Sequence, residues 1–174
     1  MTNIAIYCLL LIGGIGTFLI GMKILQSASE KLAAGPLKKM FAKTAGSRWL
    51  GAGIGGLGTC IIQSSSAMTV MIVGFVNAGA MTLFQAASYI IGANIGTTMT
   101  AQIIAFKISD YIYVIIFIGF LISFVTKSEK VKSIGQTIFA FGLLFLGIET
   151  MGDVMKPLAS SPVFTDLIGR VAHI

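Results

Sequence analysis

Long apolar stretches separated by short polar segments make up most of this 174-residue chain. A helix that crosses a bilayer needs about 20 predominantly apolar residues, and most of the stretches are close to that length. The pattern predicts membrane-spanning helices at 4–25, 83–106, 111–125 and 134–151, an amphipathic surface helix at 27–48 and a split apolar segment at 50–76. The predicted fold class is an all-α integral membrane protein.

The segment 27–48 differs from its neighbours because lysines alternate along it with apolar residues. Gly35 and Pro36 predict a break in its middle, since proline lacks the N–H that a helix interior uses. This pattern fits a short amphipathic helix on the membrane surface, with Trp49 as an interfacial anchor. A solvated loop is the alternative.

Two polar clusters interrupt the apolar segments. The first, at 63–66, splits 50–76 near its middle, and the second, at 92–98, lies inside 83–106. Hydroxyls and amides at membrane depth are costly unless they face a cavity, another helix or a ligand. We therefore predict one re-entrant hairpin of two half-helices with its tip at 63–66, and one broken transmembrane helix. Hydrogen bonding of serine and threonine between packed helices is the alternative.

Composition agrees with a membrane protein, because 56% of the residues are hydrophobic and only 10% are charged. A soluble domain has about 25% charged residues. The net charge of +6 does not indicate a nucleic-acid partner, since most basic residues lie in two segments, 31–48 and 127–132. The positive-inside rule places both segments in the cytoplasm and the N-terminus outside it. The start of the chain lacks a basic region and a cleavage site, which predicts a retained first helix.

An internal repeat relates the start of the chain to its end. A shift of 126 residues places 18–21 on 144–147, with glycine as the last residue of each. The first helix is predicted to run inward and the last outward, which gives the two copies opposite topology, as in many secondary transporters. The chain then divides into a first repeat, 1–133, and the first helix and amphipathic tail of a truncated second repeat, 134–174. Chance similarity of two glycine-rich apolar segments is the alternative.

The two polar clusters also carry a family resemblance. The sequences at 63–67 and 92–98, supported by those at 21–23, 73–79 and 144–147, resemble the type II sodium–phosphate cotransporter family, bacterial branch. The resemblance implies two inverted repeats, each with its own Gln-Ser-Ser-Ser tip, that meet around phosphate and sodium. This chain departs from that arrangement because it carries one tip.

The chemistry of each cluster suggests a ligand. Backbone N–H groups at a half-helix N-terminus supply donors and a positive partial charge for an anion, and the serines open the second arm of the hairpin. Sodium prefers oxygen ligands, which unwound backbone and hydroxyls at the second cluster would provide. The predicted phosphate ligands are Gln63, Ser64, Ser65 and Ser66. The predicted sodium ligands are Asn94, Thr97 and Thr98, with Thr59 as a weaker member.

The sequence therefore predicts sodium-coupled transport of inorganic phosphate across the cell (inner) membrane by a multi-pass protein, with no cofactor besides the coupling ion. A passive anion channel and a non-transporting scaffold or half-transporter fragment are the alternatives, and the sodium dependence of phosphate binding separates them. We expect no enzymatic activity, because no His, Cys or acidic constellation lies at membrane depth. A site shared between repeats needs two tips, so we expect a homo-oligomer or a second repeat to complete it.

Overall fold

A computed structural model of the chain describes residues 2–43, 47–104 and 111–159. Every regular element in these ranges is a helix: α1 (Thr2–Lys43), α2 (Arg48–Ile62), α3 (Ser65–Asn77), α4 (Leu83–Ile104), α5 (Ile112–Val125) and α6 (Glu129–Ala159). The all-α prediction is confirmed. Two of these helices are long and apolar enough to cross a membrane by length and composition, α1 over Ala5–Phe41 and α6 over Glu129–Pro157. The end of the predicted tail, 160–174, lies outside the described residues.

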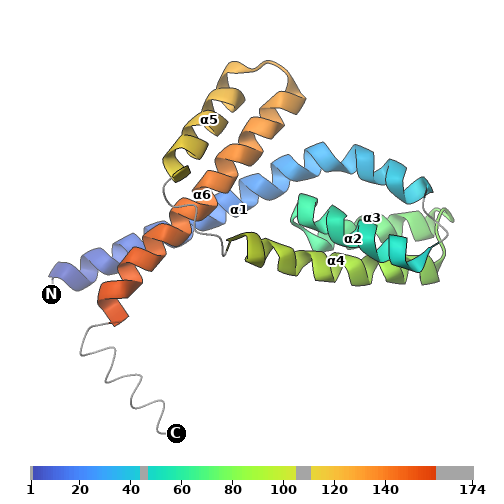
Figure 1. Cartoon of the computed structure of the whole chain (residues 1–174), viewed down its shortest axis with the longest axis horizontal. Coiled ribbons are helices and arrows are strands. Elements are labelled where there is room, and N and C mark those ends of the chain that lie inside the picture. Colours follow the sequence, from blue (N-terminus) through green and yellow to red (C-terminus); the bar gives the residue numbers. More distant parts are fainter. Residues whose placement is uncertain (1, 44–46, 105–110, 160–174) are drawn as a thin grey trace, which may run out of the picture.

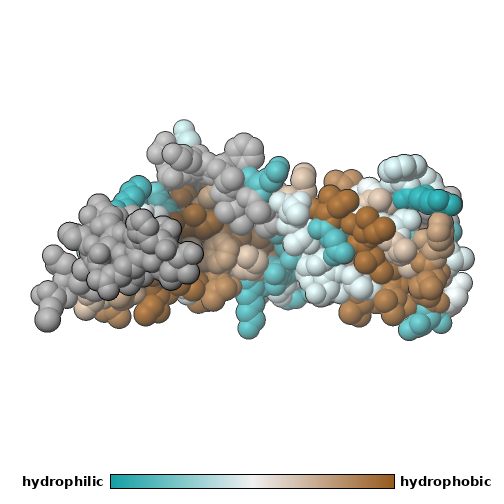
Figure 2. Space-filling model, turned by 90° about the horizontal axis from the view of Figure 1, so that it is seen from below, coloured by the Kyte–Doolittle hydropathy of each residue, from teal (hydrophilic) through white to brown (hydrophobic). Residues whose placement is uncertain are grey.

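The helices form two groups that share α1 (Figure 1). In the first group α6 crosses α1 and pairs with α5; in the second, α2, α3 and α4 lie together beside the second half of α1. Figure 2 shows broad hydrophobic patches on the molecular surface. Large apolar side chains such as Leu9, Val70 and Phe124 are well exposed. A surface of this kind suits lipid contact, because a protein in water rarely exposes apolar patches so widely.

The predicted break at Gly35 and Pro36 is wrong, because α1 is one continuous helix with Pro36 inside it. Leu37 and Phe41, which follow the proline, are buried in a core cluster with residues of α2, α3 and α4. Burial of such side chains contributes about 1.5–3 kcal/mol each, which offsets a proline cost of roughly 3 kcal/mol. The predicted surface helix 27–48 is thus largely an extension of the first helix, and α1 bends along this half (Figure 1).

α1 and α6 cross in opposite directions through close contacts at glycines. A Cβ atom on Gly21 would lie 3.1 Å from the carbonyl oxygen of Ala140, and one on Gly147 would lie 2.8 Å from that of Gly14. The two contacts are equivalent under the 126-residue shift that relates the two ends of the sequence. Gly21 corresponds to Gly147, and Ala140 corresponds to Gly14. The crossing therefore has equivalent small residues in equivalent places on the two helices.

α2 and α4 run in the same direction, side by side. Gly55 of α2 lies against the backbone of Tyr89, and Gly56 lies against Gly92 and Gly96 of α4, so both residue numbers rise together along the contact. Because α3 connects the end of α2 to the start of α4, it must run in the reverse direction. The start of α2 and the end of α3 therefore lie near the start of α4. The turn that connects α2 to α3 lies toward the end of α4.

The core of this group lies between the second half of α1 and the three shorter helices. Its largest fully buried side chains include Phe41 of α1 and Tyr89 of α4, whose ring centroids are 5.0 Å apart in an edge-to-face arrangement. Phe75 of α3 packs against Phe41 in the same way at 5.7 Å. Edge-to-face aromatic pairs add about 0.5–1.5 kcal/mol beyond burial. This aromatic cluster holds the second half of α1 against α3 and α4.

Candidate functional site

The first polar cluster interrupts the helix as predicted. α2 ends at Ile62, and Gln63 follows in the left-handed region with φ 60° and ψ 23°. Among the described residues Gln63 is the one non-glycine with positive φ. Its N–H donates to the carbonyl of Thr59 at 2.7 Å, and its side-chain amide donates to the carbonyl of Cys60. A backbone conformation that costs roughly 1–3 kcal/mol often marks a functional site.

The serines open the next helix, also as predicted. Ser64 is the N-cap of α3 with φ −147°, and its hydroxyl oxygen accepts a hydrogen bond from the N–H of Ala67 at 3.2 Å. The N–H of Met68 donates to the Ser64 carbonyl at 3.2 Å. The first-turn amides that remain for a ligand are those of Ser65 and Ser66. The start of α3 thus offers two backbone donors on the positive end of a helix dipole.

Thr59 lies in the last helical turn of α2, just before Gln63. It is more deeply buried than the other predicted ligand residues. Its side chain is 1% exposed, and its hydroxyl oxygen has no hydrogen-bond partner among the described residues. Leaving a buried hydroxyl unpaired costs about 1–3 kcal/mol. Thr59 was the weaker member of the predicted sodium set. In the structure it is the member whose oxygen most needs a partner.

The second polar cluster does not break its helix, so the prediction of a broken transmembrane helix is wrong. α4 continues from Leu83 to Ile104 through all of 92–98. Its glycines serve close packing instead, because a Cβ atom on Gly92 would overlap the carbonyl of Ala52, and one on Gly96 the carbonyl of Gly56. Small residues of this kind let two helices approach closely in a membrane.

The predicted sodium ligands of α4 are engaged within that helix or face away from α2. The hydroxyl of Thr97 donates to the Ala93 carbonyl at 3.2 Å, and that of Thr98 donates to the Ile95 carbonyl at 2.7 Å. Gly92 and Gly96 face α2, and Asn94 and Thr98 each come two positions later in the helix. Each position rotates the side chain by about 100°, so Asn94 and Thr98 point away from α2. The structure thus brings Thr59, Gln63 and the serines to one region and leaves these α4 side chains outside it.

The structure adds one residue that sequence reasoning missed. The side-chain amide of Gln26, on α1, donates to the carbonyl of Gln63 at 3.3 Å. Gln26 is half-buried and lies 37 positions from its partner. The signal available in the sequence was a lone amide at the end of a long apolar stretch. Its partner could not be inferred, because the contact depends on how α1 crosses the hairpin.

Comparisons with known proteins agree with the sequence resemblance. The profile of a family described as Na+/Pi-cotransporter matches residues 17–153. The chain is 34% identical over 113 residues to the uncharacterized protein YqeW of Bacillus subtilis, covering 65% of this chain and 36% of that protein.

Two further relatives have names that mention phosphate. YjbB of Escherichia coli, provisionally named an inorganic phosphate export protein, is 27% identical over 117 residues, which are 65% of this chain and 22% of YjbB. Sodium-dependent phosphate transport protein 2B of Homo sapiens is 34% identical over 99 residues, which are 56% of this chain and 14% of that protein. The chain thus spans between 14% and 36% of these relatives. No solved protein structure matches it.

Proposed function

The chain belongs to the Na+/Pi-cotransporter family, and from this premise we propose that it forms part of a sodium-coupled transporter of inorganic phosphate. The observation that supports this proposal most is the helix break at Gln63 and Ser64, which leaves first-turn amides of α3 at a turn between two helices. Relatives are named for phosphate export and for sodium-dependent phosphate transport. The proposal does not include the direction of transport, because one of these names specifies export and the other gives no direction.

Phosphate is proposed to bind at the start of α3. The N–H groups of Ser65 and Ser66 would donate to phosphate oxygens, and the hydroxyls of the serines would add further donors. A helix N-terminus carries roughly half a positive charge, which stabilises an anion without a neighbouring cation. No Lys or Arg occurs from 49 to 106, so the site would depend on these dipoles and on co-bound sodium. Gln63 would set the direction of α3 through its left-handed backbone.

Sodium is proposed to bind beside this turn through the hydroxyl oxygen of Thr59. The oxygen is buried and unpaired, so a cation would satisfy it, and the neighbouring carbonyls of the turn would supply further oxygens. Asn94, Thr97 and Thr98 are exposed side chains of a continuous helix and do not complete this set. We propose that they act at an ion site only where a second repeat or a second copy of the chain covers their face of α4.

The α2–α3 pair is proposed to be a re-entrant hairpin. α2 has 15 residues and α4 has 22, which at 1.5 Å per residue correspond to about 22 Å and about 33 Å. α4 is therefore long enough for a hydrocarbon core of about 30 Å, and α2 is not. Because the pair enters and leaves at one end of α4, its tip would lie within the membrane.

The whole site is proposed to need a second half. The contacts at Gly21 and Gly147 are equivalent under the 126-residue shift, which supports inverted repeats. The second tip would come from further sequence or from another copy of the chain. The positive-inside rule places the N-terminus outside the cytoplasm of a multi-pass protein in the cell membrane.

Sodium-dependent binding of radiolabelled phosphate to the chain in proteoliposomes tests the proposal. Ser65→Leu should abolish the binding, and Ser65→Ala, which keeps the backbone amide, should weaken it by about tenfold or less. Ser128→Leu in the exposed α5–α6 loop is the matched control and should bind as the unaltered chain does. Unchanged binding in Ser65→Leu would contradict the phosphate site. Phosphate flux without sodium would favour the passive channel.

A further inference from the structure

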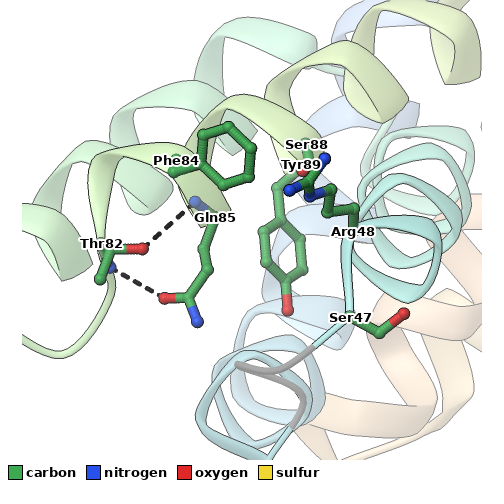
Figure 3. Close-up of a pocket in the computed structure, with 7 residues that line it drawn as sticks. All are labelled: Ser47, Arg48, Thr82, Phe84, Gln85, Ser88 and Tyr89. Atoms are coloured by element: carbon green, nitrogen blue, oxygen red, sulfur yellow. Dashed lines mark hydrogen bonds between the residues drawn. The ribbon is translucent and has the colours of Figure 1, made fainter.

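A pocket lies where α2 and α4 begin, at the opposite end of the hairpin from the turn at 63–66. Figure 3 shows the residues that line it. The cavity has a volume of about 240 Å³. It is lined by Ser47, Arg48, Thr82, Phe84, Gln85, Ser88 and Tyr89. This volume is below the range of roughly 300–1,000 Å³ that is usual for drug-sized ligands, so it suits a small polar group.

Arg48 is the one charged residue among those that line the pocket. The central carbon of its guanidinium lies 4.4 Å from the centroid of the Phe84 ring, a cation–π contact that directs the side chain from α2 toward α4 (Figure 3). No Asp or Glu occurs in the sequence from 31 to 109, which covers every residue that lines the pocket. An arginine held against an aromatic ring, in a pocket whose lining residues include no carboxylate, suits an external anion, above all the oxygens of a phosphate group.

Two helices, α2 and α4, begin at the same pocket, and only the start of α4 has a side-chain cap. At α4, Thr82 and Gln85 form a reciprocal capping box: the N–H of Thr82 donates to the Gln85 side chain at 2.9 Å, and the N–H of Gln85 to the Thr82 hydroxyl at 3.3 Å. At α2, Ser47 is the N-cap but makes no side-chain capping hydrogen bond. The first-turn amides of α2 therefore lack a cap and lie beside Arg48. Because α2 and α4 are parallel, the positive ends of both dipoles lie at this pocket.

Phe84 lines this pocket, and three more exposed apolar residues lie within two positions of a lining residue in the chain. Trp49 is 89% exposed, Leu83 77%, Phe84 60% and Leu50 56%. Tryptophan and other aromatic side chains collect at the level of lipid headgroups, where one end of the ring is wet and the other is apolar. A free ion in water needs no such apolar surroundings, whereas a lipid brings acyl chains that would contact them.

We propose that this pocket binds the phosphodiester headgroup of an anionic membrane lipid. Arg48 and the uncapped amides of α2 hold the phosphate oxygens, Ser47 and Ser88 supply hydroxyls, and the exposed apolar side chains contact the acyl chains. By its basic residues this end of the hairpin belongs to the cytoplasmic leaflet, where anionic lipids attract basic side chains. The bound lipid fixes the two ends of the hairpin at the membrane surface while the tip lies inside.

Thermal unfolding of the purified chain in a neutral detergent, in sodium-free buffer, tests this proposal. Three probes are compared: short-chain phosphatidylglycerol, short-chain phosphatidylcholine and inorganic phosphate. Phosphatidylglycerol should raise Tm in a dose-dependent way, with an apparent Kd at least about tenfold lower than that of phosphatidylcholine. Arg48→Gln should weaken phosphatidylglycerol binding by about tenfold to hundredfold, because a charge-assisted hydrogen bond is lost. Lys39→Gln, an exposed charge of α1 outside the pocket, is the matched control.

Ser88→Leu is the second variant, since it keeps every charge and fills the pocket. It should also lose the phosphatidylglycerol response, while Ser65→Leu at the hairpin tip should keep it, so that failure of the phosphate-transport site and failure of this site are distinguishable. Equal responses of Arg48→Gln and Lys39→Gln would overturn the proposal. So would a response to phosphatidylcholine equal to that of phosphatidylglycerol. Competition by inorganic phosphate at equal concentration would assign the pocket to the free ion and overturn the lipid assignment.

Discussion

The two polar clusters of this chain look alike in sequence and differ in structure. Each interrupts an apolar stretch with amides and hydroxyls, and each was predicted to break a helix. The cluster at 63–66 does so, with a left-handed Gln63 and an N-cap at Ser64, whereas the cluster at 92–98 continues as regular α4. Polar residues at membrane depth therefore do not by themselves indicate unwound backbone.

The difference follows from what surrounds each cluster. At the first, the Ser64 hydroxyl accepts from the backbone N–H of Ala67, and this local hydrogen bond stabilises a new helix start. At the second, the backbone of α2 lies directly against Gly92 and Gly96. Glycine permits unwinding, but at 92 and 96 it permits close approach of α2 to a regular helix.

Filling the contact at Gly92 should have the largest effect. Gly92→Leu places a side chain on the backbone of Ala52, which cannot move aside as a flexible side chain could. We expect a loss of about 3 kcal/mol or more in the free energy of unfolding, the upper end for overpacking. Gly53→Leu is the control, because nothing lies within 4 Å of a Cβ atom there. Equal denaturation midpoints for the two variants would mean that α2 does not pack closely against α4 at Gly92. The packing explanation for the regular helix at 92–98 would then be wrong.

Removing the unpaired hydroxyl of Thr59 should have the next largest effect, and in the opposite direction. In sodium-free buffer Thr59→Val should raise the free energy of unfolding by about 1–3 kcal/mol, because a buried hydroxyl without a partner is lost. The same variant should bind sodium more weakly, measured as the sodium concentration for half-maximal phosphate binding. Thr69→Val is the control, since the Thr69 hydroxyl donates to the Ser65 carbonyl at 2.8 Å. Destabilisation of Thr59→Val without sodium would show that the hydroxyl is satisfied within the protein.

Capping provides a direct comparison of the two clusters. Ser64→Ala removes the N-cap oxygen of α3 and should lower the free energy of unfolding by about 1 kcal/mol. Thr98→Ala removes a hydroxyl whose one hydrogen bond among the described residues is to its own helix, and should change stability by less than about 0.5 kcal/mol. Thermal unfolding of both variants in one detergent measures the difference. A loss as large in Thr98→Ala would indicate that 92–98 contains a helix end after all.

A modest gain in stability is expected at the left-handed residue. Gln63→Gly should raise the free energy of unfolding by about 0.5–1 kcal/mol, because glycine adopts positive φ without steric cost. Sodium-dependent phosphate binding should nevertheless fall, since the glutamine amide is lost. Gln102→Gly, at an exposed position of α4, is a control for the loss of a glutamine side chain outside the tip. Higher stability with undiminished binding in Gln63→Gly would remove Gln63 from the proposed site.

The sequence alone determined the features that depend on local chemistry. The length and composition of the apolar stretches indicated an all-α membrane protein, and the motifs at 63–67 and 92–98 indicated the family. The helix break at 63–66 was also predictable, because a serine that can cap a helix acts on amides only three residues away. These features need no knowledge of what lies beside them in space.

Only the tertiary structure decided where two segments far apart in sequence would meet. α1 continues past Pro36 because Leu37 and Phe41 are buried against the other helices, and α4 stays helical because α2 occupies the space at its glycines. The hydrogen bond from Gln26 to the Gln63 carbonyl depends on such a meeting as well. A local pattern states what a segment can do, and the free energy of its contacts with distant residues selects which of those structures forms.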